Sequence, residues 1–161
     1  MDTLYLTSIP IACELSPLEV LDPNTNAMAD TAILSATQPF AVQLSVTFQG
    51  TNAIALLALT PTIQAEFYAK PTTHSTTIPL GECQDIARID QLDYTLTLNI
   101  SAPLETELAP GTVYRLGALI KIGSPDGPAL ICGVQETGMV QIYAAAAVAQ
   151  ISRKKRHSRR Q

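Results

Sequence analysis

The chain has 161 residues, 47% of them hydrophobic and 15% charged, and a formal net charge of −4 at pH 7. This length suits a single domain with a sizeable core, and a charged fraction well below the usual quarter implies a surface that costs little to desolvate. Three cysteines without short spacing argue against a disulfide framework or a C-x-x-C metal site, and the lack of tryptophan argues against a sugar-stacking surface.

The first third of the chain contains one strong strand pattern. Residues 1–30 indicate a short strand at Leu4 and Leu6, followed by an arm that contains proline and asparagine. Over residues 40–48, apolar and polar residues alternate, which is typical of a half-buried strand in an antiparallel sheet. Residues 53–60 are continuously apolar and fit either a buried strand or a short helical connection.

Two further alternating segments follow in the middle of the chain. Residues 63–69 and 92–100 each predict a strand, and Pro71 and Pro103 end these two segments. The polar stretch 71–77 indicates a loop or the approach to an edge strand.

The densest acidic cluster lies between these two strands. Glu82, Cys83 and Asp85 form it, with Asp90 and Asp93 nearby. Carboxylates are the hard oxygen ligands that calcium prefers, but the spacing does not match an EF-hand loop. We therefore expect a solvated loop.

Residues 108–114 are the most informative stretch of the sequence. Leu108 precedes the turn residues Pro110 and Gly111, and Tyr114 then opens an alternating strand. This order is the pattern of a tyrosine corner, in which the phenol hydroxyl bonds to the backbone a few residues upstream and pins a crossover between two packed sheets. The motif predicts an architecture and carries no information about a reaction.

The last third of the body predicts more strands. An alternating strand over 114–122 leads into a turn over 124–128, where Asp-Gly and proline favour tight turns. A short strand, a tight turn over 136–138 and a strand over 140–144 follow. The alanine-rich residues 144–149 either extend that strand, which we favour, or begin a helix.

Short strands at this spacing predict an all-β sandwich or barrel. The corner segment resembles the E–F corner of fibronectin type III and related immunoglobulin-like domains. The resemblance is at superfamily level, and it implies an immunoglobulin-like antiparallel β-sandwich of about eight strands with Greek-key connections. It makes Tyr114 the corner tyrosine and Leu108 the buried leucine before it. Leu116 stands where antibody domains carry a cysteine, so no disulfide between the sheets is expected.

We expect three segments: an N-terminal strand and arm over 1–30, the sandwich over 31–150, and a basic tail over 151–161. The expected core comprises Phe40, Val42, Leu44, Val46, Phe67, Leu96, Leu98, Ile100, Tyr114, Leu116, Ile120, Val134, Val140 and Ile142.

Catalytic chemistry has little support in this sequence. His74 lies in a Thr- and Ser-rich loop and His157 in the tail, so neither histidine has an obvious orienting partner. The glycine-rich, P-loop, zinc-protease and nucleophile-elbow motifs are all absent. We expect no enzymatic activity, no cofactor and no metal.

The C-terminal tail is the one strong electrostatic feature. Six of the ten basic side chains lie in the last nine positions, which leaves four basic against fourteen acidic side chains, a net charge of about −10, in the rest of the chain. The six are Arg153, Lys154, Lys155, Arg156, Arg159 and Arg160. We favour docking on an acidic protein surface. Binding to nucleic acid or an anionic membrane and a solubilising terminus without a specific role stay open.

The sequence thus favours a non-enzymatic structural subunit of a larger bacterial assembly, such as a filament, sheath, cap or phage-tail-like machine. Its partners would be other protein subunits, bound through the tail and the weakly charged sheets. No targeting segment or membrane-spanning apolar run is visible, so a cytoplasmic location is expected. Two alternatives are a ligand-recognition or adhesin-type module using the loops around His74 and Asp126, and a nucleic-acid-associated protein acting through its tail.

Overall fold

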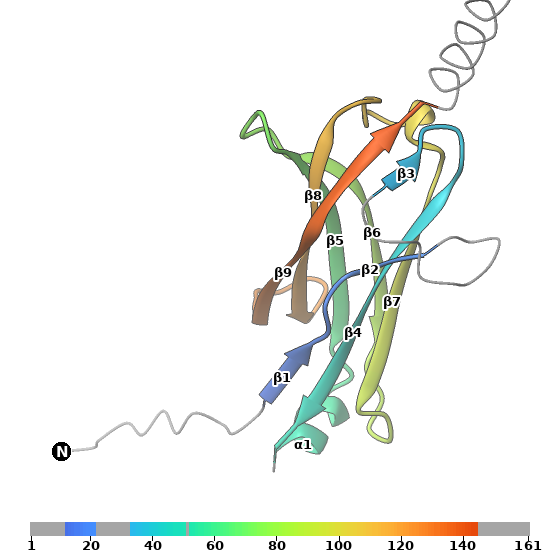
Figure 1. Cartoon of the computed structure of the whole chain (residues 1–161). Helices are drawn as coiled ribbons and strands as arrows, with labels where there is room; N and C mark the ends of the chain where they lie inside the picture. The colour runs from blue at the N-terminus through green and yellow to red at the C-terminus, as the bar shows by residue number, and fades with distance from the viewer. Residues whose placement is uncertain (1–11, 22–32, 51, 145–161) are drawn as a thin grey trace, which may run out of the picture.

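The computed structural model describes residues 12–21, 33–50 and 52–144 and shows an all-β sandwich of two sheets (Figure 1). The sandwich predicted from the sequence is confirmed. The described elements, in chain order, are β1 (Ala12–Leu15), β2 (Glu19–Leu21), β3 (Ile33–Ser35), β4 (Phe40–Gln49), α1 (Ala53–Ala58), β5 (Thr62–Pro71), β6 (Ile78–Ile86), β7 (Asp93–Ile100), the 3-10 turn η1 (Pro103–Glu105), β8 (Val113–Gly123) and β9 (Ala129–Tyr143).

The smaller sheet is built around β4. Strand β7 pairs antiparallel with one edge of β4, and β1 and β2 pair antiparallel with the other edge. β1 and β2 form one interrupted strand, because Pro17 has no N–H to donate. Ser16 bridges the interruption: its N–H donates to the Ser45 carbonyl at 2.9 Å, and its Oγ accepts from the Ser45 N–H at 2.8 Å. These two short strands lie in the segment where the sequence predicted an arm. The strand predicted at Leu4 and Leu6 lies outside the described residues.

The larger sheet has the strand order β3-β9-β8-β5-β6. Its neighbours are antiparallel, except that β3 runs parallel to the end of β9. The chain passes from β4 to β5 and β6, returns to the smaller sheet as β7, and crosses again to β8 and β9. These are Greek-key crossings between two sheets. Helix α1 makes the crossing from β4 to β5 and resolves the alternatives for residues 53–60 in favour of a helical connection, with Ala53, Leu56 and Leu57 buried.

The tyrosine corner lies at the crossing from β7 to β8. The Ala109 N–H donates to Tyr114 Oη at 2.8 Å, so the phenol bonds five residues upstream as predicted. Tyr114 and Leu108 are each 2% exposed. Gly111 adopts φ = 82°, a left-handed conformation that glycine tolerates best, and its N–H donates to the Ile142 carbonyl of β9. The corner thus ties the crossover to the last strand.

The core fills the space between the two sheets. The expected core residues are buried, with two exceptions: Leu98 is only partly buried, and Val134 is 59% exposed. The structure adds Tyr94, which is 1% exposed and lies edge-on to Phe48. Tyr94 Oη accepts from the Arg88 N–H at 2.7 Å and donates to the Gln91 carbonyl at 2.8 Å, so its polar end is satisfied.

Strand β9 differs most from the sequence prediction. The tight turn expected over 136–138 is wrong, because β9 continues from Ala129 to Tyr143. The two residues between Glu136 and Met139 instead form a bulge, since Arg115 pairs with Met139 and Gly117 with Glu136. An extra residue on one strand reverses which side chains point inward. Val140 and Ile142 therefore face the core, whereas Val134 faces outward.

The acidic cluster also differs from the prediction. Glu82, Cys83 and Asp85 lie on edge strand β6 and not in a solvated loop. The sequence missed this strand because two of its residues are proline and glycine, which are depleted in strands. Both are tolerated at an edge, where one row of backbone groups has no strand partner.

Candidate interaction surface on the larger sheet

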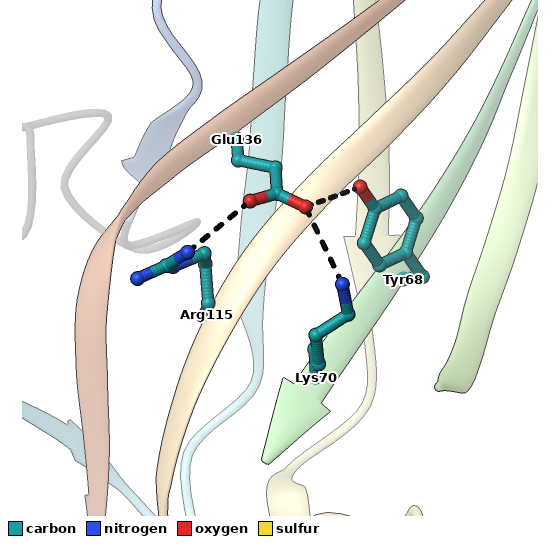
Figure 2. Close-up of polar contacts among 4 residues, drawn as sticks. All are labelled: Tyr68, Lys70, Arg115 and Glu136. Atoms are coloured by element: carbon teal, nitrogen blue, oxygen red, sulfur yellow. Dashed lines mark hydrogen bonds and ion pairs between the residues drawn. The ribbon is translucent and has the colours of Figure 1, made fainter. Parts of the chain in front are cut away.

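The outer face of the larger sheet carries a polar cluster centred on Glu136 (Figure 2). Tyr68 Oη donates to Glu136 Oε1 at 2.9 Å, and Lys70 Nζ lies 3.8 Å from the same oxygen. An Arg115 guanidinium nitrogen lies 3.6 Å from Oε2. The four residues come from β5, β8 and β9, so the cluster connects three neighbouring strands across their outer face.

Gly117 makes the contact between Tyr68 and Glu136 possible. The strand register places Tyr68 on β5, Gly117 on β8 and Glu136 on β9 in one row. A Cβ atom at position 117 would overlap the Tyr68 ring. The missing side chain therefore lets the ring lie across β8, which is a common reason for glycine within a strand.

The cluster gives its part of the outer face a net positive charge. Two cationic side chains share one carboxylate, which leaves one positive charge in excess. Lys70 and Arg115 are 44% and 46% exposed, so each ion pair is expected to contribute only about 0–1 kcal/mol. The pKa of Tyr68 is raised to about 12. Desolvation of the phenol is the largest cause, and the hydrogen bond to Glu136 and the negative charge of Glu136 raise the pKa further.

A second polar group lies further along the same face. Lys121 Nζ donates to Glu66 Oε1 at 2.9 Å, and this hydrogen bond and the carboxylate charge raise the pKa of Lys121. Gln64 donates to Glu82 at 2.9 Å. An open depression of about 410 Å³ lies next to Lys121 and the turn between β8 and β9. Its lining is mostly polar or small residues.

Strand β9 also presents an unpaired edge. β8 lies along one side of β9, while the other side pairs, among the described residues, only with β3 at positions 141–143 (Figure 1). We call residues 129–136 of β9 the open edge. Leu130 and Val134 are 64% and 59% exposed, and Cys132 is exposed between them. No charged residue occurs from 127 to 135, so the open edge is uncharged up to Glu136, its last residue.

The other described edges have features that discourage pairing with another chain. β6, at the opposite edge of the same sheet, contains Pro79 and Glu82 and pairs with β5 through an irregular register. The edge formed by β1 and β2 is interrupted at Pro17. Leu98 of β7 lies against Gly81 of β6, where the two sheets approach. Proteins protect edges by proline, charge, irregularity or coverage. The open edge has Glu136 at one end, a register shift against β8 at Leu130, and the Leu15 side chain of β1 close to Gly133. Its backbone groups nevertheless have no strand partner within the described part of the chain.

The predicted site residues fall into two groups. Leu108, Pro110, Gly111 and Tyr114 form the structural corner described above. The predicted partner-binding residues of the tail, which are Arg153, Lys154, Lys155, Arg156, Arg159 and Arg160, lie outside the described residues, as does His157. The alanine-rich segment 145–149 lies outside them too. His74 is exposed in the loop between β5 and β6.

The cluster around Glu136 was missed by reasoning from the sequence. The predicted turn places Glu136 between two strands, and alternation along a strand does not show which outward side chains of different strands meet. The available signal was Gly117 inside a strongly alternating strand, because such a glycine often marks a close approach.

Metal and membrane features can be stated only for the described residues. Among them, no three His, Cys, Asp or Glu side chains are grouped so as to hold a metal ion. No described helix has the length and apolar character needed to cross a membrane.

Comparison with known proteins gives only distant likenesses. No family model matches the chain, and no curated protein matches it. Among solved structures, a β-glucosidase from Listeria innocua is 14% identical with a TM-score of 0.44, over 83% of this chain and 16% of the glucosidase. A β-glucuronidase from Bifidobacterium dentium is 14% identical with a TM-score of 0.42, over 78% of this chain and 18% of the glucuronidase.

A third likeness covers nearly the whole of the other protein. AggA, the major subunit of aggregative adherence fimbriae type I from Escherichia coli, is 10% identical with a TM-score of 0.39, over 83% of this chain and 96% of AggA. The chain spans less than a fifth of the two glycosidases. None of these likenesses carries an argument about activity or binding.

Proposed function

We propose that this chain is a non-enzymatic structural subunit of a larger protein assembly, of the filament, sheath, cap or phage-tail-like kind. The open edge of β9 is the observation that carries this proposal. It offers unpaired backbone groups and an exposed row of Leu130, Cys132 and Val134, and an edge of this kind is a template for pairing with another chain.

The charge distribution supports the same proposal. The residues before the tail carry a net charge of about −10, from four basic and fourteen acidic side chains, and six basic residues follow in the tail. A tail from one copy is attracted to the acidic body of another, and arginine forms bidentate contacts with carboxylates. An acidic body repels the phosphate backbone, which disfavours the nucleic-acid alternative.

The finer assignments belong to the same proposal. The tyrosine corner and the parallel pairing of β3 with β9 support an immunoglobulin-like sandwich, an architecture that hosts many unrelated functions. We propose the cytoplasm as the compartment, which fits three free thiols, one of them exposed.

The test compares the mass of the species that two chains form in solution: the full chain, and a chain that ends before Ser152. We expect the full chain to form large species at low salt, and these species to dissociate as salt screens the tail. The truncated chain should keep the circular dichroism of the sandwich and lose the large species. Light scattering after size exclusion, at 50 and 500 mM salt, measures both.

A matched control separates tail charge from tail length. A chain of full length with the six basic tail residues replaced by glutamine should behave like the truncated chain. A full chain that stays monomeric at every salt and protein concentration would contradict the proposed function.

A further inference from the structure

We propose that the open edge of β9 pairs antiparallel with the same edge of a second copy, around a two-fold axis at Cys132. This inference rests on the proposed function and names the partner of its exposed edge. The resulting contact joins the larger sheets of two copies into one continuous sheet.

The backbone supplies the first reason. In an antiparallel ladder, every second residue directs its N–H and C=O away from the neighbouring strand. Along the open edge these groups have no partner among the described residues. A second copy satisfies them symmetrically, because a two-fold contact uses the same patch on both molecules. The uncharged stretch 127–135 lets the two acidic bodies approach here without placing charges directly opposite each other.

The side chains select the register. A two-fold axis at residue 131 places Asp126 opposite Glu136 of the other copy, and like charges directly opposite are destabilising. An axis at residue 133 places Leu130 opposite Glu136, which buries an apolar side chain against a charge. An axis at Cys132 instead pairs Leu130 with Val134 of the second copy, on both sides of a central pair of Cys132 side chains.

Charge complementarity favours the same register. With the axis at Cys132, the turn that carries Asp126 of one copy lies beside the row that holds Arg115 and Lys70 of the other. That row has one positive charge in excess, because Lys70 and Arg115 share only Glu136. Adjacent strands are about 4.8 Å apart, so a long arginine side chain can reach across β9 to the acidic turn. The contact occurs twice in the dimer.

The pairing also explains how two kinds of contact build an assembly. A two-fold edge contact closes on itself and gives only a dimer. A tail that docks on the body of another copy is a head-to-tail contact, and this extends the dimer into a larger species. The edge and the tail therefore have separable effects on mass.

The first test uses the full chain with Val134→Lys. The side chain is 59% exposed, so the fold should persist, whereas a lysine on each copy faces the apolar centre of the pairing. We expect sedimentation equilibrium at high salt, where the tail contact is screened, to show the dimer weakened at least tenfold. The matched control is Ile86→Lys, because Ile86 is 60% exposed on β6 at the opposite edge of the same sheet. This control should leave the dimer unchanged.

The second test determines which residues of the two copies lie opposite each other. In a Cys132→Ser background, a chain with both Leu130→Cys and Val134→Cys should form an intermolecular disulfide rapidly under mild oxidation with diamide. Directly opposite residues have Cα atoms about 4.5–5.5 Å apart, within disulfide reach. Each single cysteine variant should cross-link far more slowly, because position 130 of one copy faces position 134 of the other. The single cysteine then has no cysteine opposite it.

The outcomes separate the two proposals. If Val134→Lys and Ile86→Lys have equal effects, or if single and double cysteine variants cross-link at the same rate, the edge pairing is wrong, while tail-dependent assembly can still stand. If an added extended peptide occupies the edge and the chain alone forms no dimer at high salt, the partner is not a second copy. If the wild-type chain is monomeric under all conditions, the proposed function fails.

Discussion

Removing one hydroxyl group from the tyrosine corner should measurably destabilise the sandwich. In Tyr114→Phe the ring still fills its buried site, since Tyr114 is 2% exposed, but the Ala109 N–H loses the acceptor that lies 2.8 Å away. A net hydrogen bond contributes about 0.5–1.5 kcal/mol, and leaving its donor unpaired costs about 1–3 kcal/mol. The hydrogen bond is part-buried, so water can reach the freed N–H in part. We therefore expect a loss of about 1–2 kcal/mol in the free energy of unfolding.

Urea denaturation followed by circular dichroism measures this loss. The unfolding midpoint should fall while the slope with urea stays the same, because the surface exposed on unfolding does not change. The melting temperature should fall by about 2–4 °C for each kcal/mol lost in a chain of this size.

Tyr68→Phe is the matched control for this prediction. It removes a hydrogen bond of similar length, 2.9 Å to Glu136, on the exposed outer face of the sheet. Water can replace that bond, so the loss should stay below about 0.5 kcal/mol. We attribute the larger loss to the buried position of the Tyr114 hydroxyl group in the corner. Equal losses of unfolding free energy in Tyr114→Phe and Tyr68→Phe would refute this explanation.

Two other predictions concern the row that contains Gly117. Gly117→Ala places a Cβ atom in the Tyr68 ring, and overpacking of this kind costs about 1–3 kcal/mol. Urea denaturation should show this cost, whereas Gly127→Ala, which meets only the Ser124 side chain at 3.5 Å, should be close to neutral. The Tyr68 pKa of about 12 lies above its ordinary value near 10, so its contribution to stability is complete below pH 10 and declines as the pH rises toward 12. Absorbance titration of the tyrosines should show one group titrating at lower pH in Glu136→Gln, and an unchanged curve would contradict this assignment.

Local sequence patterns were sufficient to predict the β-sandwich architecture. Alternation over residues 40–48, 63–69, 92–100 and 114–122 predicted β4, β5, β7 and β8, because one buried face requires a period of two. The corner residues predicted a specific backbone bond, and the structure has it. Edge strand β6 was missed, since an edge accepts proline, glycine and charge that an inner strand excludes. Helix α1 stayed ambiguous, because a short apolar run fits a strand or a helix equally well.

The candidate interaction surface depended on information that the chain order does not contain. Val134, Val140 and Ile142 lie an even number of residues apart, so strict alternation places all three on one face. The bulge between Glu136 and Met139 turns the first of these away from the core. Its position follows from how β9 pairs with β8, and this pairing involves residues distant in sequence.

The sequence by itself determined the sandwich, its tyrosine corner and the division into an acidic body and a basic tail. These features follow from neighbouring residues and from composition, which act before any long-range contact forms. The tertiary structure alone decided that Leu130, Cys132 and Val134 face outward along an unpaired edge, and that Glu136 gathers Tyr68, Lys70 and Arg115. Both depend on strand register, and the register is set by the packing of the whole sheet.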